Sequence, residues 1–475
     1  MVLEALTRSA NYAAGVVTVV AVLVVFYKKL SLTGRKGILL PPGPLARWFW
    51  SNALPAANIA YALTNLVREY GPVVSFRQGS QVIIVIGSIE AAANIMEKEG
   101  GSLVDRPRSI AAGEMLSNGM GITMARSGER FRRLRKAVHP HLQPKAAEAY
   151  QDMQRENAMD LYWIYGTSRY ATSVVLRVTY GKSAPTANAD PELVRIRRVV
   201  EHFQVAVRPG AYLVDRVPLL RYLPGYGKQL YEWHHEELEL FRHQLRDQNK
   251  ADRSLTKALL ENTEEHQLST DEISYLAGSL FGAGSDTASH ATYLSPRLTP
   301  GSDRYCYGCG MPPTGSAPTF NDSSLLPQLH AFLLEALRWR PIVRIGFPHR
   351  ATKDILWRGY CIPKGATVYG CHWTLSRDPV VFPDAEIFNP QRWLDSEGCL
   401  KDNNMKFITY GFGRHVCPGL HLANHSLYIV LALLLWSFRI VQRPDAPINT
   451  HAFSDTVTPH AAPFQIDVIP RVEVA

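Results

Sequence analysis

The sequence predicts a mainly α-helical protein with small β-sheets, preceded by one N-terminal transmembrane helix. Three observations support this fold class. Amphipathic helical patterns dominate the chain, extended segments are confined to two regions, and an uncharged apolar run lies near the amino terminus. Strands and helices do not alternate regularly, which argues against a doubly wound fold.

Length and composition exclude several classes of protein. The chain has 475 residues, 46% hydrophobic and 20% charged, so disorder, collagen-like repeats and a coiled coil do not describe it. Its length allows three domains of about 150 residues or one large fold. Six cysteines are too few for a disulfide scaffold and indicate reduced thiols.

The apolar run covers residues 12–27 and is followed at once by Lys28 and Lys29. It is slightly shorter than the roughly 17 to 25 residues of a standard membrane span, and flanking residues can supply the difference. A cleaved signal peptide and a buried core helix are the alternatives. The basic residues follow the run and no small-residue cleavage site does, which favours a signal anchor with the main body in the cytosol.

The predicted organisation has three parts. Residues 1–36 form the membrane anchor, residues 37–48 a proline-rich hinge, and residues 49–475 the catalytic body. Three prolines at 41–44 fix the backbone and exclude a helix in the hinge.

The body should contain its elements in a definite order, each predicted by hydrophobic periodicity and turn residues. They are a helix at 55–70, two strands within Val73–Ile86 separated by a turn at 78–81, helices at Glu129–Leu142, Ala146–Tyr165, Glu192–Val207, Gln229–Asn249 and Asp271–Ala288, an extended region at Arg350–Tyr369 with turns at Gly359 and Gly365, and an apolar helix at Leu420–Phe438. No GxGxxG or GxxxxGK motif indicates a nucleotide site.

Positive charge is concentrated in one stretch. Arg126–Lys145 holds seven basic residues and one acid, 7 − 1 = +6 of the net +9. Such a stretch is either a solvated helix face or a surface for an anionic partner. No zinc-finger spacing or RNA-binding motif accompanies it, so no nucleic-acid partner is predicted.

The stretch Phe407–Gly419 (FITYGFGRHVCPG) carries the most specific chemistry. Gly411, Gly413 and Gly419 frame Cys417, which predicts a tight loop that presents one sulfur at the start of the apolar helix. The helix dipole and free amides would stabilise a thiolate there, and a thiolate suits a soft metal or haem iron. The alternative is a buried structural cysteine.

This loop strongly resembles that of the cytochrome P450 haem-thiolate monooxygenases. Tyr410 stands where the family usually has Phe, and His415 where it usually has the Arg that meets a haem propionate. The resemblance implies that Cys417 is the axial ligand of the iron of haem b. It also implies haem contacts from the rest of the loop, namely Phe412, Gly413, His415 and Gly419.

Three further segments match the family. Glu335 and Arg338 share a helix face, and Arg392, in Phe388–Arg392, is the third partner in a buried charge network that the resemblance implies. In Phe131–Arg135, Arg135 should bind a haem propionate, neighbouring cations should face a reductase, and Phe131 lacks the indole donor of the usual Trp.

The segment Ala283–Thr287 matches the family's oxygen-activation segment. Small residues let the helix deform beside the iron, and Asp286 with Thr287 can relay protons to oxygen. The alternative is that one of these polar residues caps a helix.

The resemblance, which runs over essentially the whole chain, also implies cofactors, partners and location. Electrons should come from NADPH through NADPH-cytochrome P450 reductase, with O2 as co-substrate and a small lipophilic molecule as substrate. The protein should be a single-pass protein of the endoplasmic reticulum membrane with a cytosolic catalytic domain. Residues 348–352 are similar to fungal secondary-metabolism or xenobiotic-oxidising members, such as those like O-methylsterigmatocystin oxidoreductase.

Residues 291–324 depart from the family pattern. Prolines and glycines, from Pro296 to Pro313, are expected to stop the central helix soon after Thr287. Cys306 and Cys309 have zinc-like spacing without a second ligand pair, so no zinc site is predicted. A catalytically impaired membrane-bound haem protein is therefore the alternative to an active monooxygenase.

Overall fold

The computed structural model describes the chain from residue 37 to residue 471 with internal gaps. The described residues are 37–45, 52, 54–55, 57–79, 81–160, 167–182, 190–247, 254–298, 316–401 and 407–471. The predicted membrane anchor lies outside them, as do residues 46–48 of the predicted hinge.

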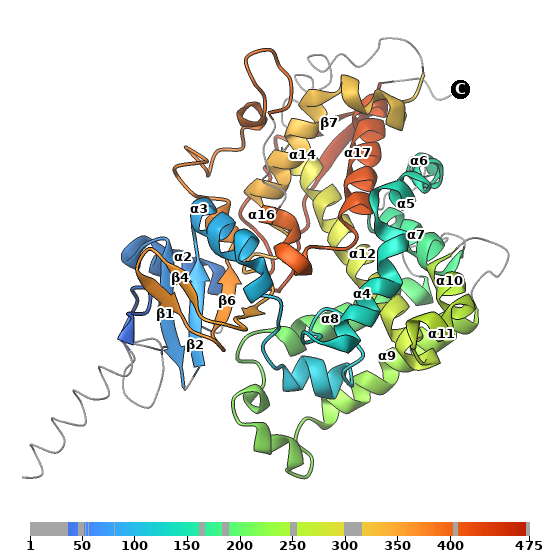
Figure 1. Cartoon of the computed structure of the whole chain (residues 1–475). Helices are drawn as coiled ribbons and strands as arrows, with labels where there is room; N and C mark the ends of the chain where they lie inside the picture. The colour runs from blue at the N-terminus through green and yellow to red at the C-terminus, as the bar shows by residue number, and fades with distance from the viewer. Residues whose placement is uncertain are drawn as a thin grey trace, which may run out of the picture.

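Helices make up most of the structure (Figure 1). The α-helices are α2 (Ile59–Tyr70), α3 (Ile89–Ala92), α4 (Glu129–Leu142), α5 (Pro144–Glu148), α6 (Gln151–Asp160), α7 (Thr167–Tyr180), α8 (Pro191–Val207), α9 (Lys228–Arg246), α10 (Leu255–Glu261), α11 (Thr263–His266), α12 (Thr270–Leu298), α14 (Pro327–Trp339), α15 (His372–Leu375), α16 (Phe407–Tyr410) and α17 (Leu420–Ser437). Short 3-10 or π segments relevant to the site are η4 (Ile110–Leu116), η9 (Pro390–Trp393) and η10 (Gly413–His415).

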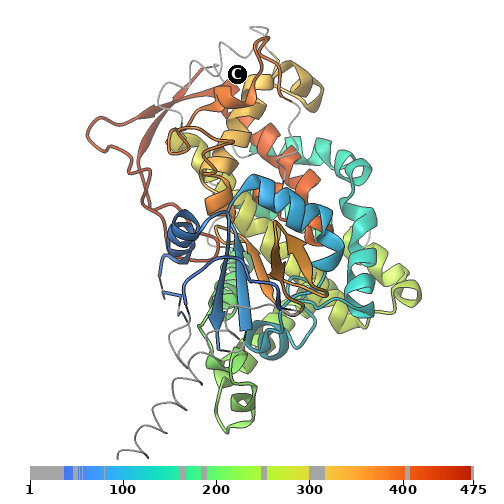
Figure 2. The same ribbon diagram turned by 60° about the vertical axis from the view of Figure 1, so that its left-hand side comes forward.

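Three small sheets complete the fold, and the largest lies to one side of the helices (Figures 1 and 2). In it, β1 (Val73–Gln78) and β2 (Gln81–Ile86) pair antiparallel, β2 pairs parallel with β6 (Thr367–Gly370), and β6 pairs antiparallel with β3 (His349–Arg350). The two-stranded sheets are β4 (Ile355–Trp357) with β5 (Tyr360–Ile362), and β7 (Phe438–Gln442) with β8 (Ile466–Pro470). Both predicted extended regions are confirmed.

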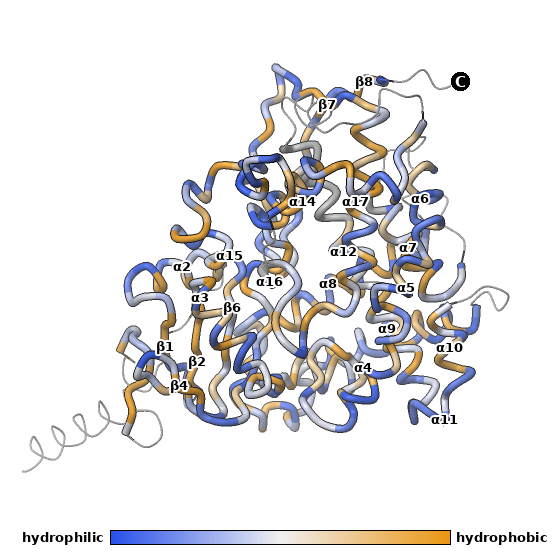
Figure 3. The backbone as a smooth tube through the Cα atoms, turned by 45° about the horizontal axis from the view of Figure 1, so that its top comes forward, coloured by the Kyte–Doolittle hydropathy of each residue, from blue (hydrophilic) through white to orange (hydrophobic). Residues whose placement is uncertain are grey.

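Burial explains the strand sequences. Ile84, Val85 and Ile86 of β2 are all fully buried, because residues on both faces of this strand pack against helices or loops. Figure 3 shows hydrophobic residues along β1 and β2 and hydrophilic residues around α11. The sheet is therefore packed on both faces, and its strand β6 contacts Phe412 of the cysteine loop through Gly370.

Helix α17 is the apolar centre of the molecule. In the part of the chain that the structure describes, it is the helix long and apolar enough to span a membrane, but 61% of it is buried inside the protein. It packs against α6, α12 and α14, and its apolar residues belong to the largest core cluster. Its composition therefore reflects a core helix, which begins directly after the cysteine loop.

Helix α12 crosses the molecule beside α7 and α9 (Figure 1). Two glycines permit these close contacts: a Cβ at Gly278 would lie 2.1 Å from the Phe241 ring of α9, and one at Gly284 would lie 2.6 Å from Val175 of α7. The helix was expected to end near Ala288 because of Pro296, and that expectation is wrong, since α12 continues to Leu298. A proline this close to the carboxyl end removes one hydrogen bond from a 29-residue helix, which earlier packing offsets.

Two other expectations need correction. The predicted single helix at Ala146–Tyr165 is divided into α5 and α6, since the chain turns at Ala149–Tyr150. Helix α7 was not predicted, because its Thr and Val residues have low helix propensity and its stability comes from packing on α12. The remaining predicted helices agree with the structure to within a few residues.

Candidate active site

The predicted cysteine loop is a tight turn between α16 and α17. Gly411 and Gly413 adopt φ values of +79° and +52°, a left-handed conformation that L side chains rarely take. The Cys417 amide donates to the Tyr410 carbonyl at 2.8 Å, which closes the loop, and Gly419 is the N-cap of α17. Cys417 is thereby held at the amino end of a long core helix.

The loop is fixed from outside by neighbouring elements. The Gly413 amide donates to Glu97 Oε1 at 3.2 Å. Phe412 is buried, and a Cβ at Gly370 of β6 would lie 2.3 Å from its ring, so this pair requires a glycine. The loop is therefore registered against the main sheet.

The sequence predicts a thiolate at Cys417, and in the polypeptide alone burial opposes that charge. Burial raises the pKa of the Cys417 thiol, while the Gly419 amide and the positive charge of Arg135 lower it less. A bound metal cation would reverse this balance, because coordination deprotonates a thiol. The sulfur thus suits a metal that supplies its own positive charge.

Two guanidinium groups lie beside the loop, that of Arg106 buried and that of Arg135 half-buried. Arg135 of α4 donates to the Val416 carbonyl at 3.3 Å, next to Cys417, and its contact with a propionate stays a prediction. Arg106 donates to the carbonyls of Phe347 and Pro348 at 3.2 and 2.7 Å, and its Nε is buried without a hydrogen-bond partner among the described residues. Burial and the charge of Arg135 lower the pKa of Arg106 to about 9.

His415 lies between these arginines and two aromatic neighbours. Its Nε2 is 2.8 Å from the Val104 carbonyl, to which it donates, and its ring lies 4.6 Å from that of Phe131. Burial, and then Arg106, lower the pKa of His415 to about 3, so the imidazole is neutral. A positive charge for a propionate would therefore come from Arg106, which the sequence placed in a turn typical of the family without assigning it this role.

His349 of β3 was also missed. Its Nδ1 bonds to the Leu103 carbonyl at 2.9 Å, and its ring is 5.4 Å from that of His415. Burial and Arg106 lower the pKa of His349 well below its usual value. Asp105, which precedes Arg106 in the chain, binds Arg126 and Arg350 and forms no ion pair with Arg106 or Arg135.

This arrangement fits haem. A sulfur held at a helix start lies beside a buried and a half-buried guanidinium, neither of which forms an ion pair with a described carboxylate, and Arg106 Nε has no partner among the described residues. Two propionates would supply the missing negative charge and hydrogen-bond acceptors. The fold and this site together define the class of haem-thiolate proteins, in which Cys417 would hold the iron and Arg106 and Arg135 the propionates.

The three predicted network residues meet in the core. Glu335 is fully buried and accepts from Arg338 Nε and Nη2, both at 2.8 Å, and from Arg392 Nε at 3.2 Å. It also accepts from the Trp393 indole at 2.9 Å and from the Asn389 amide at 2.8 Å. This network joins α14 to η9, the segment that precedes the cysteine loop.

Asp286 and Thr287 lie inside α12, sixteen or more residues from its start, so the helix-cap alternative is wrong. Thr287 Oγ1 donates to the Ala283 carbonyl at 2.7 Å, and the helix is α-helical throughout, without the expected deformation. The Asp286 carboxylate accepts from Thr458 at 2.7 Å and lies 2.8 Å from His460 Nε2. Helix α12 packs on α17, which follows the cysteine loop.

Most of the basic cluster is paired within the chain. The contacts are Arg126 with Asp105, Arg130 with Glu272, Arg133 with the Gln267 carbonyl, Arg135 with the Val416 carbonyl and Lys136 with Glu265. Arg132 and Lys145 are exposed and make no ion pair with another described residue. These two cations are the best placed to meet a partner.

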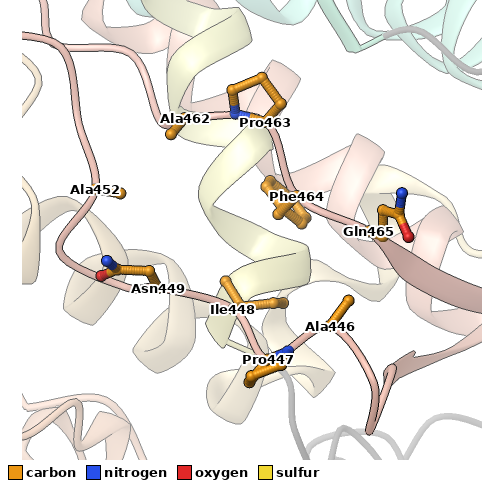
Figure 4. A pocket seen from close by; sticks show the side chains of 9 residues that line it. All are labelled: Ala446, Pro447, Ile448, Asn449, Ala452, Ala462, Pro463, Phe464 and Gln465. Carbon is orange, nitrogen blue, oxygen red and sulfur yellow. The ribbon is translucent and has the colours of Figure 1, made fainter.

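A separate pocket of about 250 Å³ lies between the two limbs of the segment that joins β7 and β8 (Figure 4). Its lining is mostly small or apolar, and includes Ile448, Pro463 and Phe464. None of the residues described above lines it. It is therefore not the site of the cysteine chemistry.

Comparison with known proteins agrees with the site. The cytochrome P450 family model matches residues 41–294 and 312–468. The gap between the two matches lies inside residues 291–324, the segment predicted to depart from the family. Cytochrome P450 monooxygenase 64 of Postia placenta is 42% identical over 91% of this chain and 92% of its own. Monooxygenase 113 of the same fungus is 40% identical over 96% of both chains, and a monooxygenase of Armillaria gallica is 30% identical over 96% of this chain and 94% of its own.

The chain belongs to the cytochrome P450 family. Its relatives are fungal monooxygenases, so the protein is an oxidoreductase of the monooxygenase class. The family uses a haem-thiolate cofactor and O2, and generally works with a redox partner and lipophilic substrates.

Proposed function

We propose that this protein is a membrane-anchored monooxygenase that takes electrons from NADPH through a separate reductase and inserts one oxygen atom of O2 into a lipophilic substrate. The observation that carries the proposal is the pairing of the Cys417 loop with the uncompensated cations Arg106 and Arg135. Bound haem supplies the activation of O2. The chain supplies the sulfur ligand, the propionate contacts and, from α12, the groups that deliver protons.

Asp286 and Thr287 are the proton-delivery pair. They follow each other on the helix that packs against α17, and a carboxylate followed by a hydroxyl can hold and pass a proton toward oxygen. Thr287 is assigned to the final position, with its hydroxyl now held by the Ala283 carbonyl. Asp286 supplies the proton that the hydroxyl passes on.

The ferrous carbon-monoxide spectrum tests the proposal. The wild type should give the band typical of thiolate-ligated haem, and Cys417→Ala should abolish it. Cys399→Ser, which changes an exposed cysteine, is the matched control and should keep the band. A wild type without the band would refute the proposal, and would favour the impaired haem protein suggested by the interrupted family match at 295–311.

Thr287→Ala tests proton delivery. NADPH consumption should continue while product per NADPH falls, because activated oxygen is then released without oxidising the substrate. Thr458→Val is the comparison, since it removes a hydroxyl that contacts Asp286 from outside the helix. Normal coupling in Thr287→Ala would refute the assigned role.

The anchor, the location and the substrate belong to the same proposal. The apolar run at 12–27 and the following lysines support a single-pass protein of the endoplasmic reticulum with a cytosolic body. Removal of residues 1–36 should move the protein from the membrane to the soluble fraction. A mass-spectrometric screen of terpenoids, polyketides and aromatic xenobiotics would identify the substrate class.

A further inference from the structure

The Asp286 carboxylate is held by a hairpin far away in the sequence. Oδ2 accepts from Thr458 Oγ1 at 2.7 Å and, more weakly, from Gln204 Nε2 at 3.4 Å. Oδ1 lies 2.8 Å from His460 Nε2. Both oxygens are therefore engaged, one by uncharged groups and the other by a titratable imidazole.

The contacts of Asp286 differ in their access to water. Thr458 is buried and Gln204 is half-buried, and these two also bond to each other at 2.6 Å. The side chain of His460 is 46% exposed, against 16% for Asp286. Among the described contacts of this carboxylate, His460 is the most exposed to solvent.

The hairpin, residues 452–462, holds His460 in this place. A bridge between Phe453 and Ala461 closes it, and His460 forms two bonds across it to Ser454, through its amide at 2.8 Å and its carbonyl at 2.8 Å. Asp455 at the tip accepts from Arg208 at 2.7 Å. These bonds fix the position of the hairpin that bears the His460 imidazole.

Charged groups of α12 and α8 act on His460, and the hairpin carries a further acid at its tip. The hydrogen bond to Asp286 of α12 raises the pKa of His460, burial lowers it, and Arg197 and Glu201 of α8 act in opposite directions. The hairpin itself contributes Asp455, which Arg208 neutralises. The hydrogen bond with Asp286 is therefore the largest influence, and the pKa of the His460 imidazole lies above its ordinary value.

We propose that His460 is the residue through which Asp286 exchanges protons with solvent during turnover. In each transfer the Nε2–H bond of the imidazolium breaks and an O–H bond forms on Asp286 Oδ1, after which the neutral ring regains a proton from water. His460 acts through Asp286 and is therefore a positioning residue. The inference rests on the proposed function, because it assumes that Asp286 supplies protons to Thr287.

Two substitutions separate proton exchange from the ion pair. His460→Gln keeps a hydrogen-bond donor for Oδ1 but has neither charge nor exchangeable proton near neutral pH. His460→Lys keeps a positive charge but does not release its proton in this range. His451→Gln is the matched control. It removes an exposed histidine that directly precedes the hairpin in sequence and has no described contact with Asp286.

The first measurement is product formed per NADPH from pH 6 to 9, in holoenzymes that show the thiolate band and are reconstituted with reductase. His460→Gln should lower this ratio about tenfold near pH 6.5 and flatten its pH dependence. His460→Lys should remain low, while His451→Gln should follow the wild type. A wild-type profile in His460→Gln, or full recovery in His460→Lys, would overturn the inference.

The second measurement does not depend on activity. A histidine whose pKa is raised on folding stabilises the protein below about pH 6.5, and this stabilisation is lost as the pH rises through the folded-state pKa. His460→Gln should therefore lower the Tm by about 1–2 °C at pH 6 and not at pH 9, with recovery in His460→Lys. An equal Tm loss at both pH values would show that the ion pair is absent and refute the inference, whereas a wild type without the thiolate band would refute the proposed function itself.

Discussion

Replacement of Glu335 by glutamine should strongly destabilise the protein. Glu335 is fully buried and holds two arginines, of which Arg338 is also fully buried. The glutamine can keep its oxygen at the position of Oε1, where Arg392 and the Asn389 amide donate. Its NH2 group then faces the donors Arg338 Nε and Trp393 Nε1, and the carboxylate charge that pairs with both guanidiniums is lost.

The expected loss is about 3–5 kcal/mol in the free energy of unfolding, the cost of removing one partner from a buried charge pair. Domains have about 5–15 kcal/mol in total, so much of the protein would be unfolded near physiological temperature. Trp393→Phe is a milder variant that removes one hydrogen bond to the charged Glu335 carboxylate and should cost about 1.5–3 kcal/mol. It keeps the prediction testable if Glu335→Gln does not accumulate.

Glu114 offers a matched control. It also binds two arginines, Arg108 and Arg221, but its side chain is 30% exposed and Arg108 is 50% exposed. Because water screens this pair, Glu114→Gln should cost about 1 kcal/mol or less. Urea unfolding of the two variants, followed by far-UV circular dichroism and tryptophan fluorescence, measures the difference. Equal losses in Glu335→Gln and Glu114→Gln would refute the reasoning from burial.

Three further predictions concern other parts of the molecule. Burial raises the pKa of Glu237 from 4.5 to about 8. Between these pH values the folded state keeps a proton that the unfolded chain releases. The free energy of unfolding should therefore fall by about 3 kcal/mol between pH 4.5 and 7. Glu237→Gln should weaken this pH dependence in urea titrations, and an unchanged slope would contradict it. Gly278→Ala should cost about 1–3 kcal/mol, because the new methyl meets the Phe241 ring, and a neutral effect on Tm would show that α9 can move away. Arg132→Glu should raise the KM for the reductase several-fold at low salt. Arg443→Glu, which reverses a charge outside the basic cluster, should leave this KM unchanged. Equal effects of the two variants would argue against a docking surface at the basic cluster.

The sequence predicted what local patterns determine. The strands at Val73–Ile86 and helix α4 have the expected limits, since alternation, a glycine turn and amphipathic periodicity act over a few residues. The length of α12 was underestimated, because local proline rules do not include the packing of its earlier turns on α7 and α9. Tertiary contacts therefore determined the length of α12 and the presence of α7, which local propensity did not predict.

The candidate site divides in the same way. Cys417, Glu335 and Asp286 could be identified because each belongs to a short motif. Arg106 and His460 could not, because their roles depend on partners across the chain: Arg106 bonds to a carbonyl 241 residues away, and His460 contacts an acid on a different element. No pattern within either segment indicates these contacts.

Buried charge in this protein is arranged in two opposite ways, and the difference has a thermodynamic consequence. The Glu335 network contains its own carboxylate, so it stabilises the fold without any ligand. Neither Arg106 nor Arg135 forms an ion pair with a carboxylate among the described residues. Their burial, and the repulsion that Arg135 exerts on Arg106, oppose folding. A dianionic ligand that binds the folded chain and not the unfolded chain removes this penalty. It also stabilises the folded state by about 4 kcal/mol when its free concentration is a thousand times its Kd. Haem binding would therefore be coupled to folding through these two arginines, whereas the Glu335 network stabilises the fold without any ligand.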